Sequence, residues 1–298
     1  MPTLNELVGE VKSKLIGYTL NQDRITYLSG AITASDTTLS VSTTDNFAKG
    51  IIEIDDELFW VEQYNKSNAT LTVAPGFGRG YNGTQAAPHS ANAQVTLSPT
   101  FPRVIIKQAI NDTISSVFPK LWAVSSTTFT YNSAVTTYAL PDDVQDVLGV
   151  SWESIGPSKE WIPVRRWRID PMANAASFNS NNSISLYDPI TSGRTVQVWY
   201  TAEANTLSSN SQDFAAVTGL PASTKDVIVL GAAARLLSFV DAGRMNFTSA
   251  EADMADTKIP SNGGTNISRY VYALYQQRLA EESGKLQGKY PTKIHYSR

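Results

Sequence analysis

The residues best suited to chemistry gather in a glycine-rich stretch. Gly78, Gly80 and Gly83 form a GxGxxG pattern, which in dinucleotide-binding folds holds a pyrophosphate at the start of a helix. Here Pro88 obstructs a following helix, and no acidic residue lies about 20 positions further on, where the ribose would need one. The stretch therefore predicts a turn between strands, with glycines at positive φ, rather than a nucleotide site.

The remaining candidates for catalysis or metal binding are sparse. The chain has no cysteine, which excludes disulfides, iron–sulfur clusters and Cys-ligated zinc. Its two histidines, His89 and His295, are far apart in sequence, and each is expected to be structural or exposed. Asp55 and Asp56 lack the spacing of a calcium loop and are expected in a turn between strands. We predict no catalytic residue, no metal site, no cofactor and no enzymatic activity.

Composition narrows the class of partner. The 298 residues suffice for one or two domains with a large core. With 24 basic and 27 acidic residues, the net charge of −3 argues against a dedicated nucleic-acid binder. The stretch from Asp36 to Glu62 contains seven acidic residues and one basic residue, Lys49, which predicts an acidic module. The chain shows no targeting segment and no apolar run of ~20 residues, so we expect no membrane association and synthesis in a cytoplasm.

Helical spacing of apolar residues appears in four separate segments. In the third segment, Gly231, Ala233 and Ala234 leave little side chain, so a neighbouring helix could pack closely against them. Gly243 is expected to end that helix. An isolated helix cannot bury its own apolar stripe, which favours packing all four together as a bundle. The expected helices span residues 3–16, 102–121, 224–242 and 267–286.

Two β-rich inserts separate these helices. The first, with five short alternating strands between turns, suggests a small barrel or sandwich. The second contains four of the six tryptophans, Trp152, Trp161, Trp167 and Trp199, which are expected in its core or at an interface. The expected strands are 38–41, 52–54, 59–62, 70–73 and 94–97 in the first insert, and 128–131, 147–153, 162–166, 183–186 and 195–200 in the second.

Arg165, Arg166 and Arg168 lie beside Trp161 and Trp167 in the second insert. Such a mixture could contact phosphates or a single strand of nucleic acid. It also suits a strand that packs its aromatic residues inward and exposes its arginines, and we favour this second interpretation.

The sequence therefore predicts an α+β fold with a four-helix bundle core, two β-rich inserted modules and an extended C-terminal tail. The tail is basic, and Pro291 prevents a helix there. The expected domains are a helical bundle from residues 1–22, 101–124 and 223–287, β-rich insert 1 at 23–100, β-rich insert 2 at 125–222, and the tail at 288–298.

Three stretches resemble proteins of tailed bacteriophages. Gly80–Val95 is similar to a stretch of the pattern RG-x-x-GT-x-A-x-x-H found in virion proteins, and Ile52–Glu57 precedes it as it does there. Leu140–Val150 resembles the opening of a module in head–tail adaptors, and Asp226–Leu237 resembles the helix that follows it. Taken in this order, the stretches resemble the family of phage head–tail connector (adaptor) proteins.

The resemblance implies a structural virion protein that forms a ring under the portal, with twelve copies usual in the family. Its implied partners are the portal protein, a tail nozzle or stopper (tail-completion) protein, other copies of itself, and duplex DNA that passes without specific binding. The implied location is the virion neck, after assembly in the host cytoplasm. A stopper, nozzle or baseplate protein that binds a partner or glycan through its β-modules is the alternative. The tail residues implied to bind the portal are Lys289, Tyr290, Pro291, Lys293, Ile294, Tyr296 and Arg298.

Overall fold

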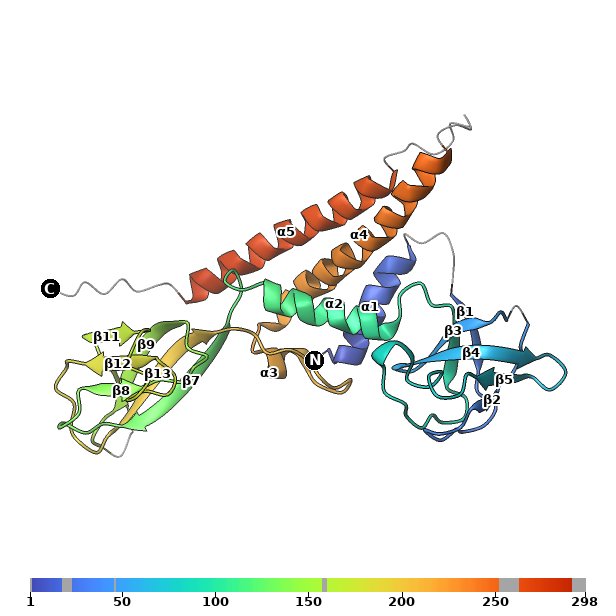
Figure 1. Cartoon of the computed structure of the whole chain (residues 1–298). Coiled ribbons are helices and arrows are strands. Elements are labelled where there is room, and N and C mark those ends of the chain that lie inside the picture. Colours follow the sequence, from blue (N-terminus) through green and yellow to red (C-terminus); the bar gives the residue numbers. More distant parts are fainter. Residues whose placement is uncertain (1, 18–22, 46, 157–159, 252–262, 291–298) are drawn as a thin grey trace. The chain divides into compact units, whose positions relative to one another are not determined.

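A computed structural model describes residues 2–17, 23–45, 47–156, 160–251 and 263–290. The chain divides into two compact units: one is formed by Met1–Leu4, Thr113–Ile228 and Ala273–Arg298, and the other by Asn5–Asp112 and Val229–Tyr272. Each unit contains one β-module (Figure 1). In the described part of the chain, the α-helices are α1 (Leu4–Ile16), α2 (Arg103–Ser116), α3 (Phe214–Thr218), α4 (Lys225–Glu251) and α5 (Gly263–Lys289).

The first β-module is a six-stranded antiparallel sheet in the order β1-β6-β3-β4-β5-β2. Its two outer strands meet, because Leu28 and Val41 form a bridge and Ser29 donates its N–H to Ser40 O, so the sheet closes into a barrel. Alternate residues fill its interior, including Leu39, Ile52 and Phe59, as expected for strands with one buried face. The strands are β1 (Arg24–Tyr27), β2 (Thr38–Ser40), β3 (Gly50–Ile54), β4 (Glu57–Asn65), β5 (Thr70–Val73) and β6 (Gln94–Leu97).

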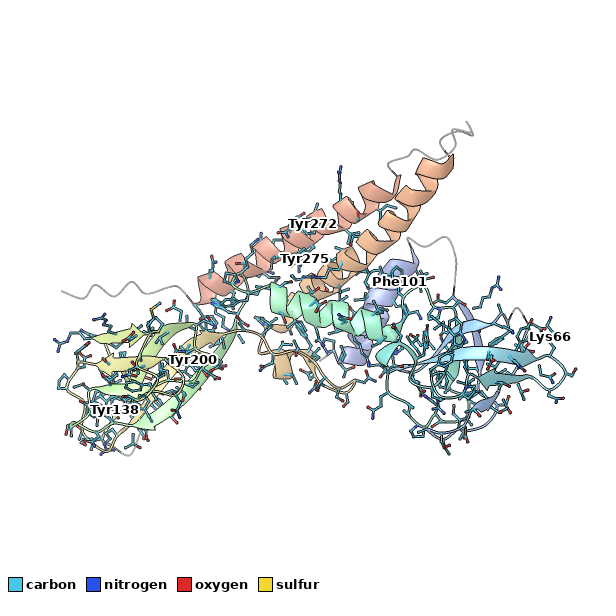
Figure 2. All side chains as sticks on the ribbon, in the orientation of Figure 1. Lys66, Phe101, Tyr138, Tyr200, Tyr272 and Tyr275 are labelled. Atoms are coloured by element: carbon cyan, nitrogen blue, oxygen red, sulfur yellow. The ribbon has the colours of Figure 1, made fainter. Side chains whose placement is uncertain are left out.

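The second β-module contains a four-stranded sheet, β10-β9-β13-β7, and a three-stranded sheet, β11-β12-β8. Val150 and Val198 from the first sheet share one hydrophobic cluster with Ile184 and Leu186 from the second, so the module is a sandwich. Tyr138 and Tyr200 belong to it (Figure 2). The strands are β7 (Ala123–Thr130), β8 (Thr137–Ala139), β9 (Asp146–Glu153), β10 (Trp161–Pro163), β11 (Trp167–Asp170), β12 (Ser183–Leu186) and β13 (Thr195–Ala202).

The prediction of a four-helix bundle core is wrong, although the fold is α+β. The two hydrophobic clusters above lie in the sheet modules. Helices α2, α4 and α5 each contribute residues to both compact units instead of forming one core of their own. An apolar stripe shows that a helix is buried on one side, but it does not show what covers that side.

Several element boundaries also differ from the expectations. Helix α4 continues through Gly243, and α5 continues through Lys289, two residues into the expected tail. Of the expected strand at 162–166, only residues 162–163 lie in a strand, β10; residues 164–166 separate it from β11. The short helix α3 was not expected from the sequence, and the Asp213 carboxylate caps it by accepting the Ala216 N–H at 2.9 Å.

Candidate functional site

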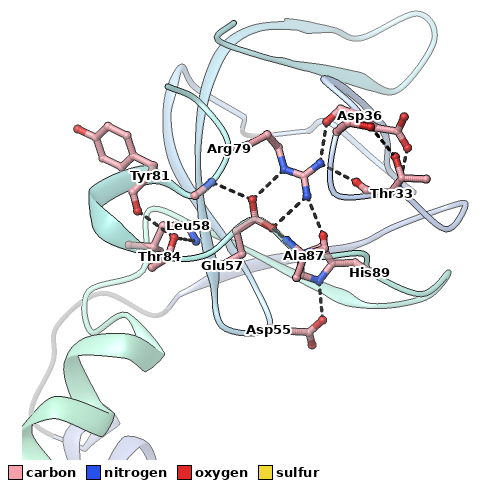
Figure 3. A network of polar contacts seen from close by, with 12 residues as sticks. Thr33, Asp36, Asp55, Glu57, Leu58, Arg79, Tyr81, Thr84, Ala87 and His89 are labelled. Atoms are coloured by element: carbon pink, nitrogen blue, oxygen red, sulfur yellow. Dashed lines mark hydrogen bonds and ion pairs between the residues drawn. The ribbon is translucent and has the colours of Figure 1, made fainter. Parts of the chain in front are cut away.

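The most extensive polar cluster in the described residues centres on Glu57, the first residue of β4 (Figure 3). Its side chain is buried, with 1% of its surface exposed. It accepts Arg79 Nε at 2.8 Å and Arg79 Nη2 at 3.0 Å, and it also accepts the backbone N–H groups of Gly80 and Ala87, each at 2.9 Å. His89 Nε2 lies 3.0 Å from its Oε2. The carboxylate is therefore surrounded by donors and has no open side for a further ligand.

Arg79 uses every N–H donor of its guanidinium. Besides the two bonds to Glu57, Nη1 donates to Thr33 O at 2.7 Å and to Asp36 O at 2.8 Å, and Nη2 donates to Ala87 O at 2.8 Å. The guanidinium carbon also lies 4.8 Å from the centre of the Phe59 ring. One side chain thus ties together loops that are 22 to 46 residues apart in sequence.

His89 extends the cluster to the turn between β3 and β4. Its Nδ1 lies 2.7 Å from Asp55 Oδ2, and its ring is buried while the Asp55 carboxylate is exposed. The His89 backbone also exchanges two hydrogen bonds of 2.9 Å with Ile32. His89 is therefore structural, which agrees with one of the two roles expected from the sequence.

The pKa values of both central groups follow from these neighbours. Burial alone would raise the pKa of Glu57, but the hydrogen bonds from Arg79, Ala87, His89 and Gly80 hold it below its usual value. Burial alone would lower the pKa of His89, but Asp55 and Glu57 raise it above its usual value. The geometry therefore favours a charged carboxylate facing a charged imidazolium and guanidinium.

The glycine-rich turn positions the cluster, as its residue types predict. Gly80 and Gly83 adopt φ of 59° and 80°, which favour glycine over other residues. Thr84 Oγ1 donates to Tyr81 O at 2.9 Å and accepts the Leu58 N–H at 3.0 Å, which fixes the turn against β4. The interpretation as a turn between strands is confirmed.

The cluster is a loop clamp: it joins the turn at Asp55, the loop at Thr33 and the stretch from Arg79 to His89. Within the described residues, no group of three or more His, Cys, Asp or Glu residues could hold a metal ion. Sequence reasoning missed Arg79 and Glu57 as partners, although Glu57 ends one of the stretches that carry the phage resemblance and Arg79 directly precedes another. An arginine beside a glycine turn, together with a glutamate at the start of a strand, is the signal that could have found them.

Three of the seven acidic residues between Asp36 and Glu62, namely Asp55, Asp56 and Glu57, pair with cations. Besides the bonds to Glu57, Asp56 pairs with Arg103 at 3.2 Å and with Lys107 at 2.6 Å, both on α2. Counting charges within this stretch alone overstates the negative charge of the module, because the partners Arg79, His89, Arg103 and Lys107 all lie outside the stretch.

Only two of the predicted portal-binding residues fall in the described part of the chain. Lys289 is the last residue of α5, and its Nζ lies 5.2 Å from the centre of the Tyr290 ring. The Tyr290 ring meets the Trp122 ring edge-on at 6.3 Å. The other predicted portal-binding residues, Pro291, Lys293, Ile294, Tyr296 and Arg298, lie outside the described residues, as does His295.

The predicted helix-packing residues are buried. Gly231, Ala233 and Ala234 lie in the buried part of α4. Burial is what close packing requires, and the role of these three residues stays a prediction.

The arginine cluster of the second module is at the surface. Arg165, Arg166 and Arg168 are exposed, and Arg166 pairs with Asp188 at 3.0 Å. Trp152 and Trp167 pack against the sandwich core, whereas Trp161 and Trp199 are 46% and 43% exposed. The tryptophans are thus divided between the core and the surface.

These features define an α+β protein whose two β-modules are inserted between helices and whose strongest polar cluster fastens loops. A family model for the SU10 adaptor protein matches residues 84–289. The match covers more than half of the chain, so the chain belongs to the SU10 adaptor protein family, and the predicted resemblance to phage head–tail adaptors is confirmed. It is a structural adaptor of a bacteriophage virion, with capsid or tail proteins as partners and the virion neck as its location.

No curated protein matches the chain. In the described part, no helix is both long and apolar enough to cross a membrane.

Proposed function

We propose that this adaptor forms a ring under the portal, joins the capsid to the tail and lines part of the passage for DNA. The observation that carries the proposal is the family match, which spans the sandwich and helices α2 to α5. The proposed role is structural rather than enzymatic and needs no cofactor. The saturated hydrogen bonding of Glu57 supports it, because a carboxylate without a free lone pair is a poor general base.

The ring is proposed to contain twelve copies and to hold the nozzle or stopper protein on its tail side. The exposed apolar residues of the sandwich support a large contact between copies or with a partner. They include Trp161, Trp199 and Tyr187 at 46%, 43% and 54% exposure. Tyrosine and tryptophan are enriched at protein–protein interfaces relative to the rest of a protein surface.

The proposed attachment to the portal uses the basic end of the chain, which begins at Lys289 and Tyr290. The experiment mixes the portal protein of the same phage with the full chain, with a chain ending at Tyr290, or with a full chain carrying Lys66→Ala. The shortened chain lacks the positive charges of Lys293 and Arg298, and Lys66→Ala controls for the loss of a positive charge elsewhere, because Lys66 is exposed on the loop after β4. We expect the full chain and Lys66→Ala to co-sediment with portal as a ring, and the shortened chain to stay free. Equal co-sedimentation of the shortened chain would reject this attachment.

The proposed passage carries duplex DNA without binding it specifically. Twelve copies at −3 each would carry about −36, which repels the phosphate backbone. We expect no measurable binding of the isolated chain to duplex DNA at physiological salt. A dissociation constant in the low micromolar range or tighter, with a steep dependence on salt, would contradict the passage and favour a DNA-binding role.

A further inference from the structure

One corner of the sandwich is rich in arginine and aromatic residues. It is formed where the chain passes from β10 in one sheet to β11 in the other. The Asp188 carboxylate fixes this turn: it accepts the N–H groups of Arg165 and Arg166 at 2.6 and 3.3 Å, and it also accepts Arg166 Nε at 3.0 Å. Tyr187 donates its N–H to Arg166 O at 3.0 Å, which ties Tyr187 to the same turn. The residues of this arginine corner, all exposed, are Trp161, Arg165, Arg166, Arg168 and Tyr187.

Two arginines of the corner can pair with a partner. Arg166 is bound to Asp188, whereas the side chains of Arg165 and Arg168 make no hydrogen bond or ion pair within the described residues. Arginine, tryptophan and tyrosine are the residue types most enriched among those that dominate binding energy at protein interfaces. A guanidinium binds a carboxylate through two parallel N–H bonds. The arginine corner therefore suits a protein surface that carries carboxylates.

Such carboxylates gather at the opposite end of the same sandwich. The last residue of β9, Glu153, pairs with Trp161 of the corner, whereas the first, Asp146, pairs with Thr201 near the end of β13. At about 3.3 Å per residue, the eight residues of β9 separate the two ends by roughly 23 Å. The residues of this acidic end, all exposed, are Asp142, Asp143, Asp146 and Glu203. Within the part of the chain that the structure describes, none of the four pairs with lysine or arginine.

We propose that the arginine corner of one copy docks on the acidic end of the sandwich of the next copy in the ring. The inference rests on the proposed function, which supplies the ring, and it names the surfaces by which neighbouring copies meet. A contact between two different surfaces repeats from copy to copy and closes into a ring when the rotation permits. The occupant is a second copy because one module carries both halves of the contact, each lacking partners of its own.

The chemistry of the two surfaces determines how strong this contact is. Exposed ion pairs contribute little individually and are screened by salt. The aromatic rings of Trp161 and Tyr187 add contact area that salt does not weaken. Free subunits should therefore associate weakly, and more tightly at low salt, whereas subunits held side by side on the portal would make the contact readily.

Sedimentation velocity of the isolated chain tests the contact without the portal. We expect self-association at low salt that is largely lost in about 1 M salt, where the screening length is about 3 Å. Arg165→Glu combined with Arg168→Glu should weaken the association about tenfold, and so should Asp142→Lys combined with Glu203→Lys, because each change places like charges in the contact. An equal mixture of the two variants should restore it, because every contact between unlike copies then joins opposite charges.

The matched control reverses two cations elsewhere. Lys49→Glu combined with Lys66→Glu changes the net charge exactly as the arginine variant does, on exposed residues of the barrel, and should associate like the natural chain. A natural chain that sediments as a monomer at low salt would overturn the proposal, as would equal association of the arginine variant and the natural chain. Binding of duplex DNA that is lost in the arginine variant, with self-association unchanged, would assign the corner to phosphates instead.

The absence of cysteine from the natural chain permits a second measurement that does not depend on charge. Chains carrying Arg165→Cys are mixed with chains carrying Glu203→Cys and oxidised mildly at low salt. We expect the mixture to form disulfide-linked dimers about tenfold faster than either variant alone, because a head-to-tail contact brings different residues together. Equal rates for Arg165→Cys alone and for the mixture would reject the head-to-tail arrangement. Neither measurement uses the portal, so failure here is distinct from failure of the portal co-sedimentation.

Discussion

The barrel and the sandwich fasten their loops in different ways. In the barrel, three ionisable side chains, the buried Glu57 and His89 and the half-buried Arg79, hold loops far apart in sequence. In the sandwich, the loop at Tyr138 is fastened by neutral groups. Tyr138 Oη contacts Asn132 and Val135, and its ring stacks on Phe129 with the ring centres 4.3 Å apart.

This difference predicts how the stability of each module responds to substitutions and to pH. A buried charged cluster is tolerated because every partner is satisfied, and removing one partner leaves the others buried and uncompensated. A neutral cluster loses only the contact that is removed, together with a modest desolvation cost. The barrel should therefore respond sharply to single substitutions and to pH, and the sandwich should respond gradually.

The largest effect is expected for Glu57→Gln. The substitution keeps the size of the side chain but removes the charge that compensates Arg79 and His89, so the barrel should lose about 3–5 kcal/mol of stability. Hydrogen exchange resolved by peptide can measure the opening free energy of each module in the full chain. We expect faster exchange in β3, β4 and β6, with β9 and β13 unchanged.

Glu62→Gln provides the control for this substitution, because Glu62 is on the same strand but exposed. Exchange in the barrel should stay within about 0.5 kcal/mol of the natural chain, as is usual for surface substitutions. If both variants behaved alike, the charged cluster would not be what holds the barrel loops.

The second largest effect is expected in the sandwich for Phe129→Ala. The ring packs partly buried against the core and stacks on Tyr138, so its loss should cost about 2 kcal/mol, less than for a fully buried phenylalanine. The neighbouring exposed residue gives the control, Thr130→Ala. Hydrogen exchange in β13 should report the loss, and a cost as large as that of Glu57→Gln would remove the contrast between the modules.

A smaller effect is expected for Tyr138→Phe. The hydroxyl accepts the Asn132 N–H at 2.9 Å and donates toward carbonyl groups of the same turn, so its removal should cost about 1 kcal/mol. Tyr187→Phe is the control, because Tyr187 is exposed on the same module. Thermal unfolding of the two variants in parallel measures the difference, and equal midpoints would show that the hydroxyl contributes nothing.

Local features of both modules could be predicted from the sequence. The turn at Asp55–Asp56, the glycine-rich turn and strands such as β12 follow from residue types within a few positions, and the structure confirms them. The break between β10 and β11 was missed, because the residues around it alternate as they would in one strand.

Contacts over long separations could not be predicted in the same way. Glu57 is 22 residues from Arg79 and 32 from His89, and alternation shows which side of a strand is buried without showing which loops meet there. The wrong helical bundle has the same cause. Apolar spacing identified α1 as a helix with one buried face, but the surface that covers such a face depends on the whole fold.

The smallest effect is expected from pH, and it separates the modules without any substitution. Because the pKa of His89 is raised in the folded barrel, its contribution to stability is fully present below its ordinary value of 6.5 and is lost as the pH rises through the folded value. Because the pKa of Glu57 is lowered, its contribution is present above 4.5 and is lost as the pH falls through the folded value. These two groups therefore favour the barrel most strongly between about pH 4.5 and 6.5.

The titration of Glu53 and Tyr200 determines which controls this pH measurement needs. Glu53 has a raised pKa because of its burial, so its contribution falls as the pH rises and can overlap with that of His89. His89→Gln separates the two, because it removes only the histidine contribution. In the sandwich, burial and Asp143 raise the pKa of Tyr200 to about 12, far above the range measured.

Between pH 6 and 8.5, hydrogen exchange corrected for its intrinsic pH dependence should show the barrel of the natural chain losing stability, while the sandwich stays constant. In His89→Gln the decline of the barrel should become shallower. A decline of equal slope in both chains would assign it to Glu53 and leave His89 as an uncharged structural residue.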